Sequence, residues 1–327
     1  MDIIVTRGLS KVYRRFEKQP GLGGSIKSLF RREYMDKRAV EAFDLRVGQG
    51  EFVGLIGPNG AGKTTLVKLL TGIIAPTSGE IDVLGYYPNK LEHAFKRRYA
   101  VVMGQKSQLM FELSAADIFL LFKELYDIPD AEYKRNVDYF VDLFGVAEQL
   151  NVQVRTLSLG ERMKLELIVA LLHNPSVLFL DEPTIGLDAV AQRQMRGFLK
   201  EVNRERGTTI LLTSHYMEDI KSLCPRCVVI NHGAKLYDGA LESLFAKYQT
   251  HKRISVSFAG EHSAPPPEGA TVLESGPFKL SLLIRREQAN AALKSLIDGG
   301  DIVDMSIEEE DIGVVVERIY AGEGALA

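Results

Sequence analysis

A glycine-rich segment near residue 60 has the residue types and spacing of a phosphate-binding loop. Residues 57–64 match G-x-x-x-x-G-K-[ST] at every fixed position. An apolar run over 52–56 precedes the segment and a helix-like run follows it, which is the strand–loop–helix context that this motif requires. In that context backbone N–H groups bind phosphate, Lys63 reaches the β- and γ-phosphates, and the Thr64 hydroxyl completes a Mg²⁺ shell. The expected nucleotide-binding residues are Gly57, Pro58, Asn59, Gly60, Ala61, Gly62, Lys63, Thr64 and Thr65.

Two adjacent carboxylates follow a second apolar run, at residues 177–180. Asp181 can hold the water shell of Mg²⁺, and Glu182 can orient and polarise an attacking water. Two neighbouring carboxylates at a strand end are most often solvated surface groups when seen alone. Downstream of a phosphate loop the catalytic interpretation is stronger, so the pair predicts nucleotide hydrolysis.

The rest of the composition is that of a soluble globular protein. The 327 residues are 46% hydrophobic and 25% charged, which are ordinary values for folded domains. Lys and Arg total 40 against 43 Asp and Glu, a net charge of −3, so nucleic acid is not expected as a partner. The longest apolar run, 167–172, is far shorter than the about 20 residues of a membrane span. Because the N-terminus also lacks a signal-peptide pattern, we expect a cytoplasmic protein.

The pattern of elements predicts two domains. Strand-like and helix-like segments alternate from residue 39 to about 250, which is typical of an α/β layered domain. Within it, residues from about 106 to 175 carry apolar side chains at helical spacing. From residue 251 on, alternating strands, a proline-rich loop and helical stretches indicate a small α+β domain. We therefore expect domains at 1–250 and 251–327, with a helical subdomain at about 106–175.

Residues 14–38 differ from their surroundings. They hold eight Lys or Arg against three acidic residues. Ile26, Leu29 and Phe30 fall on one face of a possible short helix over 25–32. A contact with anionic lipid or a membrane partner and a solvated surface insertion are both open interpretations.

The two cysteines, Cys224 and Cys227, form a CxxC pattern. A zinc site needs two more ligands, and no second CxxC is present in the sequence. Because Cys227 opens an apolar run, we expect both cysteines to be buried structural residues.

With its motifs in this order, the chain resembles the ATP-binding cassette (ABC) ATPases, the nucleotide-binding subunits of ABC transporters. Residues 157–162 resemble the signature sequence of that family, 185–188 its D-loop, 213–215 its switch histidine and 101–105 its Q-loop. The resemblance covers about residues 1–245. It implies a P-loop NTPase α/β core of the ABC type with a helical subdomain, followed here by the small C-terminal α+β domain, with ATP and Mg²⁺ as cofactors.

The resemblance also implies roles for single residues. Glu182 is the implied catalytic carboxylate, His215 contacts the γ-phosphate, and Gln105 approaches the metal and the water. The implied catalytic residues are thus Lys63, Gln105, Glu182 and His215, and the implied Mg²⁺ residues are Thr64, Gln105 and Asp181. Tyr13 is the expected adenine-stacking residue, with Phe16 and Phe30 as alternatives.

The signature segment implies a second copy of the chain. Ser158 and the Gly160 N–H lie at a predicted helix start, which is an anion site. In the family this anion is the γ-phosphate held by the opposite subunit, and Glu161 and Asp188 are also assigned to nucleotide binding. The sequence shows one phosphate loop and one signature, so we expect two copies to form an ATP sandwich dimer. Two departures, Leu159 and Ile185 in place of the usual glycine and serine, leave the expected hydrolysis in place.

The implied function is ATP hydrolysis that powers export of a drug-like or lipid-like solute. The chain would work through a separate integral membrane permease, as a peripheral protein on the cytoplasmic side of the inner membrane. The apolar stretch 108–113 is either ordinary packing or the surface that receives the permease; the resemblance favours the second. The alternative is a soluble ABC-type ATPase switch that acts on a macromolecule without transport. The domain at 251–327 either steadies or regulates the dimer or is a passive extension.

Overall fold

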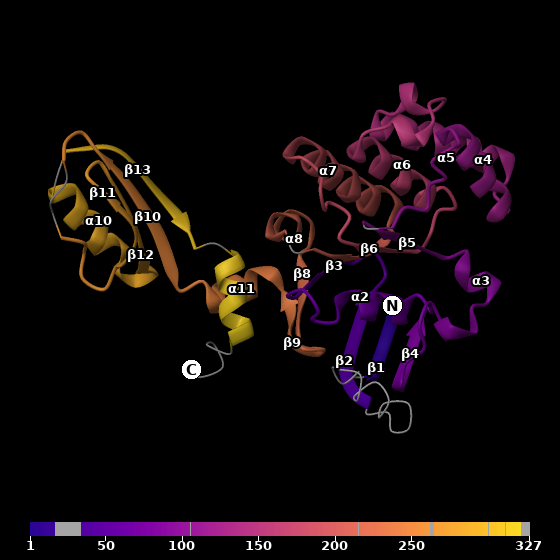
Figure 1. Cartoon of the computed structure of the whole chain (residues 1–327), viewed down its shortest axis with the longest axis horizontal. Helices are drawn as coiled ribbons and strands as arrows, with labels where there is room; N and C mark the ends of the chain where they lie inside the picture. Colours follow the sequence, from indigo (N-terminus) through magenta and orange to yellow (C-terminus); the bar gives the residue numbers. More distant parts are fainter. Residues whose placement is uncertain are drawn as a thin grey trace, which may run out of the picture. The chain divides into compact units, whose positions relative to one another are not determined.

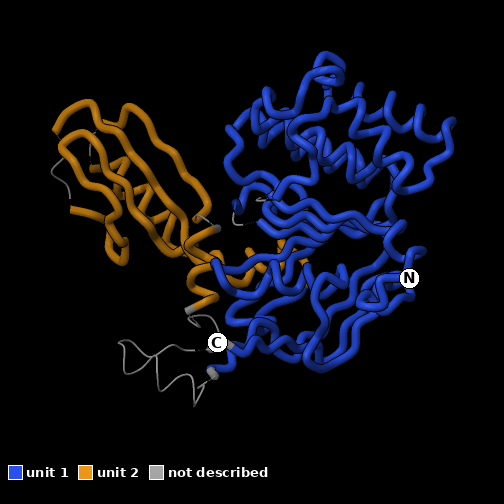
Figure 2. Tube along the Cα trace, turned by 45° about the vertical axis from the view of Figure 1, so that its right-hand side comes forward, with its two compact units in different colours: residues 1–238 blue, residues 239–327 orange. Residues whose placement is uncertain are grey.

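The computed structural model describes residues 1–16, 34–104, 106–214, 216–261, 265–299, 301–310 and 312–321 (Figure 1). The chain divides into two compact units, Met1–Asp238 and Gly239–Ala327 (Figure 2). The last residues of the expected 1–250 domain thus group with the C-terminal unit. None of the helices in the described ranges has the length and apolar character needed to cross a bilayer.

A six-stranded sheet forms the centre of the first unit, in the order β5-β6-β7-β3-β8-β9. The first five strands in this order, from β5 to β8, pair in parallel with one another. Their near-continuous apolar sequences are typical of parallel strands that are covered on both faces. The strands are β3 (Phe52–Ile56), β5 (Tyr99–Met103), β6 (Val177–Asp181), β7 (Thr209–Thr213), β8 (Arg226–Asn231) and β9 (Ala234–Ala240). Because parallel strands end at one edge, the residues after β3, β5, β6 and β7 meet there.

A second, antiparallel sheet completes the core of this unit. It consists of β1 (Asp2–Phe16), β2 (Tyr34–Gly48) and β4 (Ser78–Val83), in the order β2-β1-β4. Helix α2 (Lys63–Leu70) packs its apolar face into a core cluster that both sheets share. The strand expected at 3–13 continues to residue 16, so both described ends of the 14–38 segment are paired strands. The helix expected over 25–32 lies outside the described residues.

A group of helices lies above one face of the six-stranded sheet in Figure 1. The expected helical region contains α4 (Ala115–Leu125), α5 (Asp130–Phe144) and α6 (Leu159–Leu171). Local signals set their ends, because Ser114 and Ser158 cap α4 and α6 and a left-handed Gly145 terminates α5. In the described part of this unit the other helices are α3 (His93–Lys96), α7 (Ala189–Arg206) and α8 (Met217–Leu223), with single turns at Pro88–Lys90, Ala147–Gln149 and Val154–Thr156.

The C-terminal unit is an α+β fold. Its antiparallel sheet has the order β11-β12-β10-β13, and α10 covers one face through a core that includes Ile254, Leu282 and Leu296. The strands are β10 (His251–Phe258), β11 (Thr271–Gly276), β12 (Lys279–Arg285) and β13 (Ile302–Glu309). The helices are α9 (Leu241–Tyr248), α10 (Ala289–Asp298) and α11 (Ile312–Ala321), with one turn at Arg286–Gln288.

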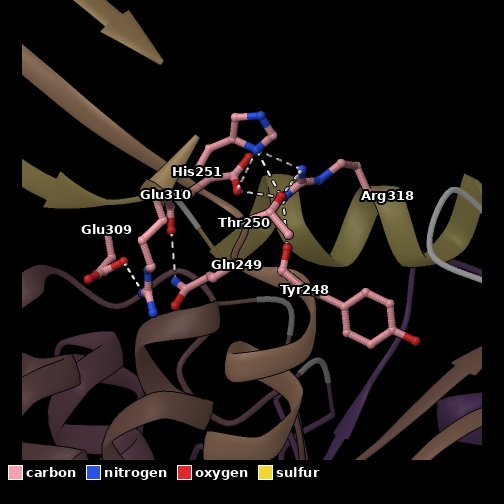
Figure 3. Close-up of polar contacts among 8 residues, drawn as sticks. Tyr248, Gln249, Thr250, His251, Glu309, Glu310 and Arg318 are labelled. Carbon is pink, nitrogen blue, oxygen red and sulfur yellow. Dashed lines mark hydrogen bonds and ion pairs between the residues drawn. The ribbon is translucent and has the colours of Figure 1, made fainter. Parts of the chain in front are cut away.

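An ion pair between a partly exposed arginine and a buried carboxylate joins α11 to the strand ends of this unit (Figure 3). The Arg318 Nη2 donates to the buried carboxylate of Glu310, and the same nitrogen donates to the carbonyl of Tyr248 at 3.0 Å. The Gln249 amide donates to the backbone carbonyl of Glu310, also at 3.0 Å. One guanidinium therefore links α11, the end of α9 and the residue after β13.

Replacing Arg318 by alanine is expected to lower the free energy of unfolding of the C-terminal unit by about 3 kcal/mol, because Glu310 then stays buried without its cation. Hydrogen exchange of β10 and β13 amides in the full chain measures this loss. Lys279→Ala is the control, because the Lys279–Glu274 pair is more than half exposed and should contribute less than about 1 kcal/mol. Equal losses in the two variants would contradict the prediction.

Candidate functional site

The loop between β3 and α2 has the backbone that phosphate binding requires. Gly60 and Gly62 have φ angles of +82° and +113°, which favour glycine. A Cβ on Gly62 would lie 2.2 Å from the Ala39 carbonyl oxygen, so this position has no room for a side chain. Gly62 is also the N-cap residue of α2, and no side chain forms a capping hydrogen bond at this end of the helix. The first N–H groups of the helix are thus oriented for an anion.

Lys63 lies buried beneath this loop. Its Nζ donates to the carbonyls of Gly57 at 2.7 Å and Pro58 at 3.3 Å, and lies 4.0 Å from a carboxylate oxygen of Glu182. Burial lowers the pKa of Lys63, whereas the carboxylates of Glu182 and Asp181 act in the opposite direction. Gly57 and Pro58, which were predicted to bind the nucleotide, therefore hold the Lys63 ammonium group through their carbonyl oxygens.

The end of β6 brings the predicted metal residues together. The Thr64 hydroxyl donates to one oxygen of Asp181 at 2.8 Å, and the Thr213 hydroxyl donates to the other at 2.6 Å. Thr64 and Asp181 supply the oxygen donors that Mg²⁺ prefers. Sequence reasoning assigned no role to Thr213, although it ends β7 directly beside Asp181 in the sheet register.

Glu182 occupies a strained position just beyond β6. Its φ is +55°, which is unusual for a residue with a side chain. The Glu182 N–H donates to the backbone carbonyl of Thr213 at 3.0 Å. This anchor holds the carboxylate beside Lys63 at the edge of the phosphate loop.

A cavity of about 540 Å³ lies between the loop and these carboxylates. Tyr13, the expected adenine-stacking residue, lines it together with Asp181, Glu182 and every predicted loop residue from 59 to 65. Three lysines that sequence reasoning missed also line it, namely Lys37, Lys68 and Lys106. Lys37 belongs to the 14–38 segment and is the register partner of Tyr13 across β1 and β2. The cluster of ammonium groups favours a polyanionic ligand.

The predicted signature residues lie apart from this cavity. Ser158 and Glu161 form a reciprocal capping box at the start of α6, and hydrogen bonds from Ser158 lower the pKa of Glu161. Asp188 accepts from Ala191 N–H at 2.8 Å and caps α7. The Leu159 side chain packs toward Gly186, because a Cβ on Gly186 would lie 3.1 Å from a Leu159 methyl carbon. Of these described residues and Gly160, none lines the phosphate cavity of its own chain.

Gln105, His215 and Phe30 lie outside the described residues, as does the side chain of Phe16.

Both cysteines are free and buried. Burial raises the pKa of Cys227 to about 12. Its thiol is therefore protonated at neutral pH, which suits a packing role.

Comparison with known proteins agrees with this geometry. Residues 40–185 match the family model described as ABC transporter. The chain is 35% identical over 290 residues to the daunorubicin resistance ATP-binding protein DrrA3 of Streptomyces coeruleorubidus, across 86% of this chain and 89% of that protein. It is 38% identical over 214 residues to the Nod factor export ATP-binding protein I of Burkholderia thailandensis, across 65% of this chain and 69% of that protein.

A solved structure of an ATP-binding subunit of an ABC transporter aligns with a TM-score of 0.62 and 25% identity, over 75% of this chain and 93% of that one. These similarities confirm the family and fold class that the motifs indicated. The chain therefore belongs to the ATP-binding subunits of ABC transporters and is a P-loop ATPase that uses ATP and Mg²⁺.

Proposed function

We propose that this chain hydrolyses ATP to power export of a drug-like or lipid-like solute through a separate membrane permease. The observation that carries the coupling to a permease is an exposed apolar surface at Met110 and Phe111, shortly after Lys106, which lines the nucleotide cavity. The names of two relatives, one a daunorubicin resistance ATP-binding protein and one a Nod factor export ATP-binding protein, support an export role.

At the nucleotide site, each described residue has a proposed task. The loop N–H groups and Lys63 hold the phosphates, and the Nζ exchanges its carbonyl partners for phosphate oxygens. Thr64 and Asp181 hold Mg²⁺, which supplies charge neutralisation at the β- and γ-phosphates when bound. Glu182 accepts the proton of the attacking water, and Tyr13 stacks on adenine. Gln105 and His215 keep the roles that the family resemblance implies.

A second copy is proposed to complete each site. Ser158 and Gly160 stand at the exposed start of α6, where backbone N–H groups attract an anion. They do not line their own chain's cavity, so the anion they suit is the γ-phosphate of the other copy. Glu161 shapes this start through the capping box, and Asp188 does the same for α7. ATP would then drive closure of the dimer, and hydrolysis would reopen it.

The stretch 108–113 combines an anchored half with an exposed half. Leu109 is buried, whereas Met110 and Phe111 are 46% and 43% exposed. The Phe111 carbonyl accepts from Arg155 N–H at 3.0 Å, and the Arg162 guanidinium lies 5.6 Å from the Phe111 ring centroid. The backbone is thus held while apolar side chains face outward, which suits a short amphipathic helix of a permease. We accordingly place the protein on the cytoplasmic face of the inner membrane, with 14–38 as a possible contact for anionic lipid.

A pull-down from detergent-solubilised native membranes tests this function. The Glu182→Gln chain, held with ATP, should recover a polytopic membrane protein in stoichiometric amount. Adding Met110→Ser and Phe111→Ser should abolish that recovery, whereas adding Leu236→Ser, at an equally exposed leucine (46%), should not. Recovery of only a second copy, or of ribosomes or DNA-bound factors, would instead favour the soluble-switch alternative.

A further inference from the structure

A buried carboxylate on α6 contacts the chain segment that follows β5. Glu166 is only 4% exposed and stands about two helical turns after Ser158. One of its carboxylate oxygens accepts from the Gln108 N–H at 2.6 Å, and the other accepts from the Ser107 hydroxyl at 2.8 Å. The Ser107 oxygen in turn accepts from the Leu109 N–H at 3.0 Å. Glu166 therefore organises the whole turn at 107–109.

Stability alone does not account for this carboxylate. Its neighbours on α6, Leu165 and Leu167, are fully buried apolar residues. Burial raises the pKa of Glu166 above its usual value, which reports the cost of keeping the charge there. An apolar side chain of similar size is often as stabilising as a buried charge. The role of Glu166 is better sought in what its hydrogen bonds hold in place.

The other end of the same segment is fixed against the catalytic strand. Gly104 N–H donates to the Asp181 carbonyl at 2.9 Å, and a Cβ on Gly104 would lie 2.2 Å from the Glu182 carbonyl oxygen. Lys106 N–H closes a turn to the Met103 carbonyl at 2.9 Å, and Lys106 lines the nucleotide cavity. Gly104 and the turn at 107–109 are thus held by two anchors, one on β6 and one on α6.

We propose that Glu166 is a positioning residue that ties α6 to the segment 104–108. Through it, the start of α6, which we propose faces the second copy, and Lys106 at the nucleotide cavity of its own chain are held in one register. A hydrogen-bonded carboxylate suits this task because it fixes both distance and direction to two donors at once. The inference rests on the catalytic role proposed for Gln105, which follows Gly104 in the chain; Glu166 acts only through this segment.

Steady-state kinetics of the full chain test the proposal. Glu166→Ala should lower kcat per ATP-binding site about tenfold or more while KM changes less than about twofold, because the variant loses positioning rather than ground-state binding. Glu166→Gln should recover kcat to within about threefold, since its carbonyl still accepts from Gln108 N–H and its amide can donate to the Ser107 oxygen. The control is Asn136→Ala, which removes an equally buried (4%) side chain bonded to the Leu172 carbonyl without touching 104–108. It should leave kcat per binding site unchanged.

Two further variants keep the test decisive if Glu166→Ala folds poorly. Ser107→Ala changes an exposed residue, should lower kcat in the same direction, and should be non-additive with the change at Glu166. Gln105→Ala separates the two proposals. If it lowers turnover while the Glu166 and Ser107 variants behave like Asn136→Ala, the inference is overturned and the site assignment stands. If Gln105→Ala has no effect either, the proposed role of Gln105 falls, and the inference falls with it.

Discussion

Replacing Glu182 by glutamine is expected to slow ATP turnover about 1000-fold while ATP still binds. The amide has the same shape but cannot accept the proton of the attacking water. The backbone anchor from Glu182 N–H to the Thr213 carbonyl does not involve the side chain, so the strained turn should persist. Loss of a negative charge 4.0 Å from the Lys63 Nζ also leaves more of the ammonium charge for phosphate, so ATP affinity should hold or rise.

Single-turnover hydrolysis and equilibrium ATP binding separate these two effects. Glu80→Gln is the matched control, because Glu80 is an exposed carboxylate on β4 away from the cavity, and its turnover should equal that of the wild type. If the Glu182→Gln chain hydrolysed ATP within tenfold of the wild-type rate, the proton would have to go to another group, and the assignment of the base would be wrong.

Replacing Lys63 by alanine is expected to weaken ATP binding about 100-fold, the loss of about 3 kcal/mol of charge-assisted hydrogen bonding, and to abolish measurable hydrolysis. The lysine contributes twice. Its charge binds the phosphates, and before ATP arrives its hydrogen bonds to the Gly57 and Pro58 carbonyls keep the loop in a conformation ready for binding. Lys63→Arg should rescue poorly, because a planar guanidinium does not fit a buried site shaped for a compact ammonium.

Fluorescent nucleotide titration measures this loss. Lys68→Ala removes another ammonium group that lines the cavity, but one without the carbonyl contacts of Lys63. The ATP affinity of this variant should therefore fall by less than about fivefold. Similar losses in both lysine variants would mean that general positive charge, rather than the buried position of Lys63, binds the nucleotide.

The sequence by itself determined the features that depend on contiguous residues. The phosphate loop was predictable because one short segment supplies its glycines, its lysine and its helix start. The carboxylates at 181 and 182 were predictable because the run 177–180 is apolar throughout, and a buried strand has to end where charged side chains begin. The capping of α6 by Ser158 and Glu161 follows from a local spacing, and the α+β character of the C-terminal unit follows from alternating patterns.

The tertiary structure alone decided which distant residues meet. Thr213 bonds to Asp181 only because β7 lies beside β6 in the sheet order, and Lys37 lines the cavity because β2 pairs with β1 at Tyr13. In the sequence Glu166 is one polar residue within the otherwise apolar run 165–172, and only packing brings it against Ser107. Arg318 and Glu310 likewise pair only once α11 has packed against the ends of α9 and β13. Hydrophobic periodicity sets which face of an element is buried. It does not encode which partner covers that face, since that choice depends on the packing of all the elements together.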